Sequence, residues 1–245
     1  MIGTRLPHRV QLSPNIGERV DNIKPGLLIL HYTGMSDAQK ACDWLCDAQS
    51  GVSCHYLIDE AGHIIQMVDE AARAWHAGVS SWHGETDINS HSIGIEIHNV
   101  GHTGGYPDFP QAQMDAVAAL SLDIVERHKI KPFNVLAHSD VAPGRKVDPG
   151  EKFDWGYLAN KNVGHWTAAE RLSGGSFLQL GDEGDPVFAL QAMLRLYGYG
   201  LEANAQFDNR TKIVVEAFQR HFRQARVDGI ADQSTVATLH KLLRR

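Results

Sequence analysis

A glycine- and serine-rich stretch interrupts the chain between Asn160 and Phe177 and separates two different hydrophobic patterns. Before it, short apolar runs alternate with segments of helical periodicity, whereas after it only helical periodicity remains. Such a composition is typical of a linker. The length of 245 residues also exceeds the roughly 100–200 residues of one typical domain. The sequence therefore predicts one domain over 1–160, a linker over 161–176 and a small domain over 177–245.

The first part has the pattern of an α/β domain. Short apolar runs predict strands over 27–32, 56–58, 64–68, 93–97 and 135–137. Helical periodicity predicts helices over 36–49 and 112–128, the second with its apolar side chains on one face. Gly62 stands in a short connection between two strands and predicts a hairpin there. The expected fold is a mixed central β-sheet flanked by helices.

The second part predicts a small all-α domain. Its three helices are expected over 187–197, 210–222 and 233–243. Asp185 is a suitable N-cap, and Pro186 fits the first helical position after it. A module of this size is near the lower limit for independent folding.

Charge and hydropathy exclude several classes of protein. The net charge is −6 and the first part is the acidic one, which argues against a nucleic-acid partner. Apolar runs such as Leu27–Leu30 are far shorter than the roughly 20 residues of a membrane-spanning helix. Residues 1–17 lack the apolar run of a signal peptide, so from the sequence we expect a cytoplasmic location. A monomer is favoured.

The three cysteines predict neither a disulfide framework nor a metal site. Cys42, Cys46 and Cys54 are an odd number, and no CxxC pair occurs among them. We expect reduced thiols that are partly buried, with Cys42 and Cys46 on one face of a helix.

Two buried-looking strands each end on a histidine. The run 27–30 leads directly into His31, and the run 134–137 leads directly into His138. A loop stiffened by two Pro-Gly pairs follows His138 and can return Asp148 towards it. Two histidines and one carboxylate on rigid supports, with a fourth position left for water, form the ligand set of a catalytic zinc site.

Two further residues complete a hypothesis of metal-assisted amide hydrolysis. Glu96 lies in the strand over 93–97, on the face opposite its isoleucines, and a carboxylate there is costly unless it is paired or functional. Zn²⁺ lowers the pKa of its water to about 7. Glu96 would take a proton from that water and deliver it to the leaving amine. Lys146 would stabilise the oxyanion.

Each residue taken alone also has a structural explanation. His31 can be a histidine of the core, Asp148 a turn residue before proline, and Glu96 a solvent-facing residue of a half-exposed strand. Nor does the chain contain a short ligand motif such as HExxH. Spacing alone therefore leaves these alternatives open.

Several ordered motifs over about residues 25–158 resemble one enzyme family. The motifs are His31-Tyr-Thr, Ser53-Cys-His-Tyr-Leu-Ile58, Ala74-Trp-His-Ala-Gly-Val-Ser80, Ser92-Ile-Gly-Ile-Glu96 and His138-Ser-Asp-Val-Ala-Pro-Gly-Arg-Lys-Val-Asp-Pro-Gly150. They are similar to motifs of the zinc-dependent N-acetylmuramoyl-L-alanine amidases of the AmpD and AmiD group. These enzymes hydrolyse the amide bond between N-acetylmuramic acid and L-alanine in peptidoglycan.

The resemblance implies a role for each matching residue. It implies that His31, His138 and Asp148 bind Zn²⁺, that Glu96 is the general base and that Lys146 stabilises the oxyanion. Trp75 and His76 fall on the family's cleft-wall stretch and Tyr56 is similarly placed, so the resemblance implies substrate binding by all three. Core packing is an equal explanation for Trp75 and Tyr56. His98 stands where the family pattern suggests an acidic or amide residue.

The second part resembles the three-helix peptidoglycan-binding domain. The motifs are Leu180-Gly-Asp-Glu-Gly-Asp185, Ala189-Leu-Gln191, Ala217-Phe-Gln219 and Val227-Asp-Gly229. The resemblance implies attachment to the cell wall, which would raise the local substrate concentration, and therefore periplasmic or cell-envelope action. A helical cap that docks on the first domain without a ligand is the structural alternative.

We therefore expect a two-domain zinc amidase that acts on peptidoglycan or its muropeptides. A non-catalytic peptidoglycan recognition protein on the same fold is one alternative, but such relatives lose a zinc ligand and all three are present here. A zinc peptidase that cuts within the stem peptide is the other. Only the family resemblance separates it from the amidase, because both reactions are amide hydrolysis.

Overall fold

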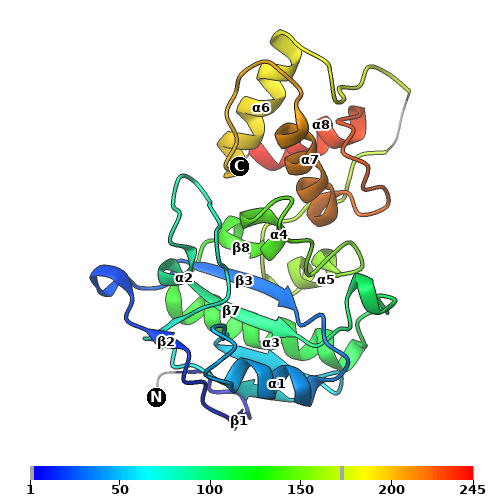
Figure 1. The fold of residues 1–245 in the computed structure, drawn as a ribbon. Helices are drawn as coiled ribbons and strands as arrows, with labels where there is room; N and C mark the ends of the chain where they lie inside the picture. The colour runs from blue at the N-terminus through cyan, green and yellow to red at the C-terminus, as the bar shows by residue number, and fades with distance from the viewer. Residues whose placement is uncertain (1–2, 172–173, 245) are drawn as a thin grey trace.

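The computed structural model describes residues 3–171 and 174–244 and shows an α/β domain followed by a helical domain (Figure 1). The strands are β1 (Arg9–Val10), β2 (Ile16–Gly17), β3 (Leu27–Tyr32), β4 (Tyr56–Ile58), β5 (Ile64–Gln66), β6 (Arg73–Ala74), β7 (Ser92–Ile97) and β8 (Val135–Ala137). The α-helices are α1 (Ala38–Cys46), α2 (Ile88–His91), α3 (Gln111–His128), α4 (His138–Val141), α5 (Trp155–Asn160), α6 (Asp185–Tyr197), α7 (Asn209–Phe222) and α8 (Gln233–Leu243).

The central sheet is mixed, which confirms the predicted fold class. Its six strands follow the order β1-β5-β4-β7-β3-β8. The four strands β4, β7, β3 and β8 run parallel to one another, whereas β4 and β5 form the predicted antiparallel hairpin. β2 and β6 form a separate two-stranded antiparallel sheet. In the part of the chain that the structure describes, no helix is long and apolar enough to cross a membrane.

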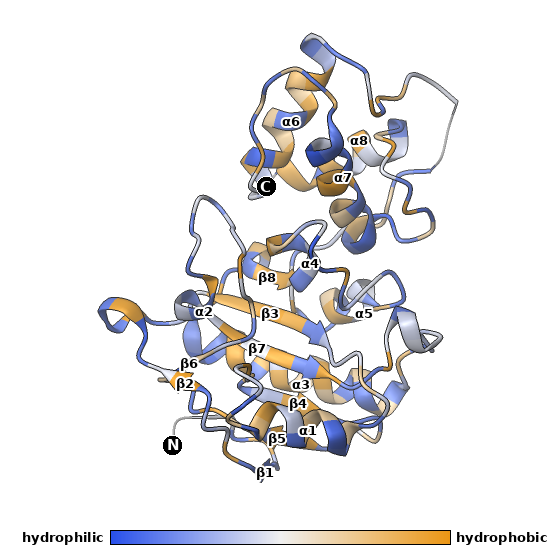
Figure 2. Ribbon diagram, viewed as in Figure 1, coloured by the Kyte–Doolittle hydropathy of each residue, from blue (hydrophilic) through white to orange (hydrophobic). Residues whose placement is uncertain are grey.

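The period-two pattern of the inner strands gives each face of the sheet its own partner. Leu28 and Leu30 of β3 pack with the apolar face of α3, whereas Leu27 and Ile29 belong to the cluster that includes the C-terminal helices. Figure 2 shows the inner strands in the hydrophobic colour, which changes to the hydrophilic colour where β3 and β7 end. Polar residues are therefore concentrated at the carboxyl edge of the sheet, where its parallel strands end.

Several element boundaries differ from the predictions. The strand expected over 64–68 ends at Gln66, because the N–H groups of the next two residues both turn to the carbonyl of His55. The helix expected over 36–49 begins at Ala38, where the Asp37 carboxylate caps it by accepting from the Lys40 N–H. Gly184 rather than Asp185 is the N-cap of α6.

Some short elements were not predicted at all. The loop expected after β8 begins instead with a single helical turn, α4, whose first residue is His138. The elements absent from the prediction are β1, β2, β6, α2, α4 and α5. Each is too short to show a hydrophobic period, so tertiary contacts rather than local pattern decide their conformation. All three cysteines are free, and Cys42 and Cys54 are buried in an apolar cluster beside α1, as expected of structural thiols.

The two domains share one hydrophobic core. Trp82, from the loop after β6, is 1% exposed and packs edge-to-face against the rings of Tyr197 and Tyr199. The contact is close enough to require a glycine, because a Cβ on Gly198 would overlap the Trp82 ring. Buried residues of both domains belong to a single cluster. The C-terminal helices are therefore docked on the α/β domain rather than tethered beside it.

A buried carboxylate crosses the same boundary. Asp140 of α4 is fully buried and accepts hydrogen bonds from the Tyr199 hydroxyl at 2.7 Å and from His221 Nδ1 at 2.7 Å. The His221 ring is stacked on Trp155, with 3.7 Å between ring centroids. Asp140 also accepts from the backbone N–H of Ala137, at the start of α4. A charge without solvent is stable only with such partners, so the helical domain completes the hydrogen bonding of α4.

A second buried carboxylate, Glu70, joins the sheet to α3. Its side chain has no exposed surface and binds Arg127 through both oxygens, His128 at 2.7 Å and the hydroxyl of Tyr56. Burial opposes ionisation of Glu70, but these hydrogen bonds outweigh it and lower the pKa of the carboxyl to about 2.

The ionised Glu70 carboxylate should make folding stability depend on pH. Because its folded pKa lies below the ordinary 4.5, its contribution is complete above pH 4.5 and is lost as the pH falls towards 2. We expect Glu70→Gln to lower the free energy of unfolding by about 1–3 kcal/mol at pH 7. The gap between this variant and the wild type should close below pH 4.5. Urea titrations at several pH values measure it, and a gap that is independent of pH would contradict the assignment.

Candidate active site

Three donor atoms from separate elements converge at the carboxyl edge of the sheet. His31 is near the end of β3, His138 begins α4 directly after β8, and Asp148 lies in the loop that follows. His31 Nδ1 and His138 Nδ1 are 2.9 Å apart, and Asp148 Oδ2 is 2.9 Å from the second and 3.3 Å from the first. All three residues are buried. The structure therefore brings together the ligand set that was predicted from the strand ends.

The protonation of these groups suits a divalent cation. Burial, with the neighbouring His138, lowers the pKa of His31 to about 4, so its imidazole is neutral at pH 7. Burial opposes ionisation of Asp148, but the two histidines hold its pKa well below the ordinary value. Two imidazoles and one carboxylate whose donor atoms lie about 3 Å apart fit a tetrahedral ion with one open position.

The ring orientation of His138 is fixed by a backbone carbonyl. His138 Nε2 lies 3.1 Å from the oxygen of Ala77, which can only accept. Arg145 Nη2 is 3.3 Å from the same nitrogen but already donates to the Ala77 oxygen, so we assign the proton to Nε2. The lone pair of Nδ1 then faces the donor cluster. Arg145 also donates to the oxygens of Ala77 and Val79, which ties the loop after α4 to the segment after β6.

Glu96 lies beside the donor cluster because β7 pairs with β3 in register. His31 and Glu96 are direct partners across these parallel strands, so their side chains share one face. Oε2 of Glu96 is buried and has no hydrogen-bond partner among the described residues. Burial, and then the charge of Asp148, raise the pKa of Glu96 well above its ordinary value, while Lys146 opposes the rise. An unpartnered carboxyl of raised pKa is suited to accept and return a proton.

A cleft of about 420 Å³ opens over these groups. Its lining includes Glu96, His138, Asp148 and Lys146, so the half-buried ammonium of Lys146 lies in the same cleft as the proposed base. The backbone N–H of Lys146 donates to Ala142 at 3.1 Å, which fixes the loop that carries it. The cleft thus places a carboxyl, a cation and two of the three metal-ligand candidates, His138 and Asp148, around one volume.

The three residues expected to bind substrate take different positions. Trp75 and His76 line the cleft. Tyr56 does not: its side chain is 0% exposed and its hydroxyl donates to Glu70, so the expectation for Tyr56 is wrong. The aromatic ring fills the core, and the polar end has its partner inside the protein. His98 is also buried and binds Glu60 at 3.1 Å, which supplies an acidic group next to that position.

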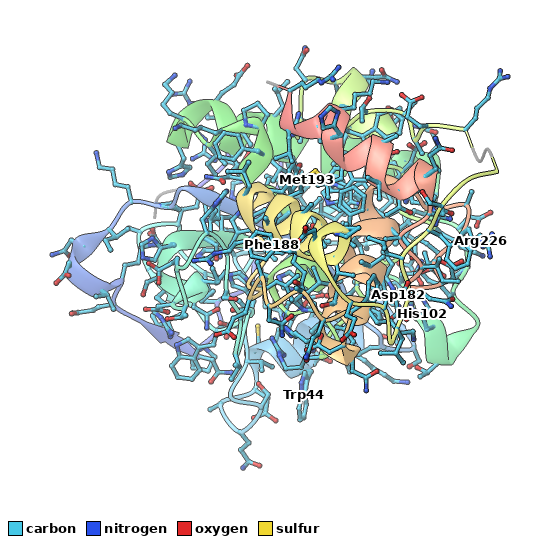
Figure 3. The ribbon with its side chains drawn as sticks, turned by 90° about the horizontal axis from the view of Figure 1, so that it is seen from above. Trp44, His102, Asp182, Phe188, Met193 and Arg226 are labelled. Carbon is cyan, nitrogen blue, oxygen red and sulfur yellow. The ribbon has the colours of Figure 1, made fainter. Side chains whose placement is uncertain are left out.

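The residues of the cleft that were not predicted include Trp44 and Arg145. Trp44, on the outer face of α1, is 49% exposed and lines the cleft, and it extends outward from the helix in Figure 3. A large exposed aromatic side chain on an amphipathic helix was the available signal. Arg145 also lines the cleft, but its only signal was its place next to Lys146.

A mixed sheet that holds two imidazoles, one carboxylate and an adjacent unpartnered carboxyl at its edge has the organisation of a metallohydrolase. Comparison with known proteins gives the family. Residues 21–151 match the family model of N-acetylmuramoyl-L-alanine amidase, and residues 183–239 match that of a putative peptidoglycan binding domain. The chain belongs to the N-acetylmuramoyl-L-alanine amidase family and carries a peptidoglycan-binding domain after it.

Individual relatives share both parts of the chain. N-acetylmuramoyl-L-alanine amidase AmiD of Escherichia coli is 37% identical over 233 residues, which are 89% of this chain and 82% of that protein. Its solved complex with anhydro-N-acetylmuramic acid-L-Ala-D-gamma-Glu-L-Lys has a TM-score of 0.76 and 36% identity and covers 98% of this chain and 92% of that one. AmpDh3 of Pseudomonas aeruginosa has a TM-score of 0.74 at 32% identity, covering 90% and 91%. These findings confirm the predicted family.

Proposed function

We propose that this enzyme uses Zn²⁺ to hydrolyse the amide bond between N-acetylmuramic acid and L-alanine in peptidoglycan or its muropeptides. The observation that carries the proposal is the convergence of His31, His138 and Asp148 beside Glu96. Solved relatives hold an anhydro-N-acetylmuramic acid peptide and an anhydromuramic pentapeptide, which supports anhydro-muropeptides as one substrate class.

The residues of the cleft divide the reaction among them. His31, His138 and Asp148 would hold Zn²⁺. The bound ion would act as a Lewis acid and would lower the pKa of its bound water to about 7. Glu96 Oε2 takes a proton from the attacking water as the bond to the carbonyl carbon forms. The same oxygen gives that proton to the L-alanine nitrogen as the amide bond breaks. The Lys146 ammonium stabilises the negative charge on the carbonyl oxygen between these steps.

The domain division supports action at the cell wall. We propose 1–160 as the catalytic domain, 161–176 as the linker and 177–245 as the peptidoglycan-binding domain. The match of 183–239 to a peptidoglycan-binding family supports this assignment of the last part. Attachment of that domain to the polymer would keep the cleft close to its substrate, and we therefore propose the cell envelope as its place of action.

Mass spectrometry of the products tests the proposed function. Defined muropeptides are incubated with zinc-loaded protein and with protein stripped by a chelator. We expect a free stem peptide that begins with L-alanine, and a peptide-free muramyl sugar, only in the presence of zinc. Cleavage within the stem peptide would assign a peptidase instead, and binding without cleavage would leave a recognition protein. Equal cleavage by stripped protein would contradict the metal requirement.

Trp44 should contribute to substrate binding. Its exposed ring at the cleft can stack on an apolar face of the substrate. We expect Trp44→Ala to raise KM about 5- to 30-fold with little change in kcat, because loss of one exposed aromatic contact costs roughly 1–2 kcal/mol. Val79→Ala removes an apolar side chain that is 87% exposed and serves as the control. An unchanged KM in the Trp44 variant would exclude the contact.

A further inference from the structure

One face of β7 consists of residues that all serve the site. Ser92, Gly94 and Glu96 alternate with buried isoleucines and therefore point to the same side of the sheet. Glu96 is the proposed base. Ser92 hydrogen-bonds to the ring of His76, from the segment that follows β6, and Gly94 leaves space for that ring.

We propose that His76 is a positioning residue that holds His31 with its Nδ1 lone pair directed at the metal site. The inference rests on the proposed metal site and deepens it. His76 Nδ1 lies 3.0 Å from His31 Nε2, which is the ring nitrogen remote from the donor cluster. In this role His76 acts on the reaction through a ligand.

The donor and acceptor in each hydrogen bond can be assigned by starting from the carbonyl oxygen of Ile88, which can only accept. The hydroxyl of Ser92 donates its one proton to the carbonyl oxygen of Ile88 at 2.6 Å. Ser92 Oγ must therefore accept from His76 Nε2, at 3.1 Å. With its proton on Nε2, the His76 ring accepts at Nδ1, so His31 Nε2 donates. The proton of His31 is thereby kept on Nε2, and Nδ1 is left free as a ligand.

Packing holds the His76 ring in the position that these hydrogen bonds require. A Cβ on Gly94 would lie 2.7 Å from the ring, so only glycine leaves room for it. The side-chain oxygen of Asn89 accepts from the backbone N–H groups of His76 at 3.0 Å and Ala77 at 2.8 Å. Rotation of the ring is restricted on one side and the backbone is fixed on the other.

The same two residues orient both imidazole ligands. His76 accepts from His31 through its side chain, and Ala77 accepts from His138 through its carbonyl oxygen. A dipeptide anchored by Asn89 therefore sets the tautomer of each histidine. Partners of metal ligands typically contribute 10- to 100-fold in metal affinity, and only the side-chain half of this pair can be removed by substitution.

Zinc affinity in a matched pair of variants tests the inference. In His76→Asn, Oδ1 occupies the place of the imidazole Nδ1 and can still accept from His31, whereas His76→Phe keeps the ring and removes the acceptor. We expect the Phe variant to bind zinc about 10- to 100-fold more weakly than the wild type, and the Asn variant to recover most of that loss. The readout is the zinc dissociation constant from competition with a chelating dye. His63→Phe, at an exposed histidine, is the control.

The outcomes separate this inference from the proposed function. A wild type that binds no zinc would overturn the proposed function itself. Zinc binding that is unchanged in His76→Phe, or equally weakened in both variants, would overturn only the role of the acceptor.

A measurement on the unaltered protein avoids any dependence on folding of the variants. Nitrogen-15 NMR of the zinc-loaded protein should show His31 and His76 both protonated at Nε2. A proton on Nδ1 of His76 would reverse the hydrogen bond between His76 and His31 and would overturn the inference.

Discussion

Glu96→Gln is expected to lower kcat about 10²- to 10⁴-fold while the protein keeps its zinc. Glutamine has nearly the same shape as glutamate but cannot accept a proton at neutral pH. Oε2 of Glu96 has no hydrogen-bond partner among the described residues, so the variant breaks no hydrogen bond at that oxygen. Removal of a buried carboxyl of raised pKa should also leave the fold at least as stable. Turnover of a defined muropeptide and zinc content by elemental analysis measure the two effects.

Glu126→Gln provides the control for this result. Glu126 is exposed on α3, and α3 packs against the sheet away from the cleft residues. We expect its kcat to equal that of the wild type. A Glu96 variant that retained full activity would mean that another group accepts the proton, and one that lost zinc would mean that Glu96 supports the ligands instead.

His221→Ala is expected to lower the free energy of unfolding by about 3–5 kcal/mol. The substitution removes one of the partners of the fully buried Asp140 carboxylate. It also leaves a cavity beside Trp155, on which the imidazole is stacked. Urea denaturation followed by tryptophan fluorescence measures the loss. His240→Ala, at an exposed position of α8, should change stability by less than about 0.5 kcal/mol.

The shape of the same unfolding curve is a second part of this prediction. Because buried residues of both domains belong to one cluster, the wild type should unfold in a single transition, with fluorescence and circular dichroism changing together. Two separate transitions would show that the shared core does not couple the domains.

The metal-ligand candidates could be predicted because strand ends are visible in a sequence. An apolar run that stops at a histidine marks a rigid position at a sheet edge, and this applies to both His31 and His138. The return of Asp148 was also predictable, since two Pro-Gly pairs stiffen its loop. Long helices such as α3 and α7 could be located because their apolar residues recur with the helical period.

The contacts around the ligands could not be predicted in this way. His76 lies in a segment without a hydrophobic period, and its role depends on a chain of hydrogen bonds that links it to β3, α2 and β7. Tyr56 lies within one of the motifs but points into the core, where its hydroxyl donates to Glu70. Trp44 was predictable only as an exposed aromatic side chain, because nothing local indicates that α1 borders the cleft.

The interdomain contacts also limit how this enzyme can be recombined. Peptidoglycan-binding domains are attractive parts for chimeric hydrolases, since a wall anchor could be joined to any catalytic domain. Here the anchor carries Gly198, Tyr199 and His221 as counterparts of Trp82 and Asp140. A replacement helical domain without these residues would leave the Trp82 indole exposed and the Asp140 carboxylate with fewer hydrogen-bond partners. Exchange of the helical domain therefore requires that these five positions be exchanged or redesigned together.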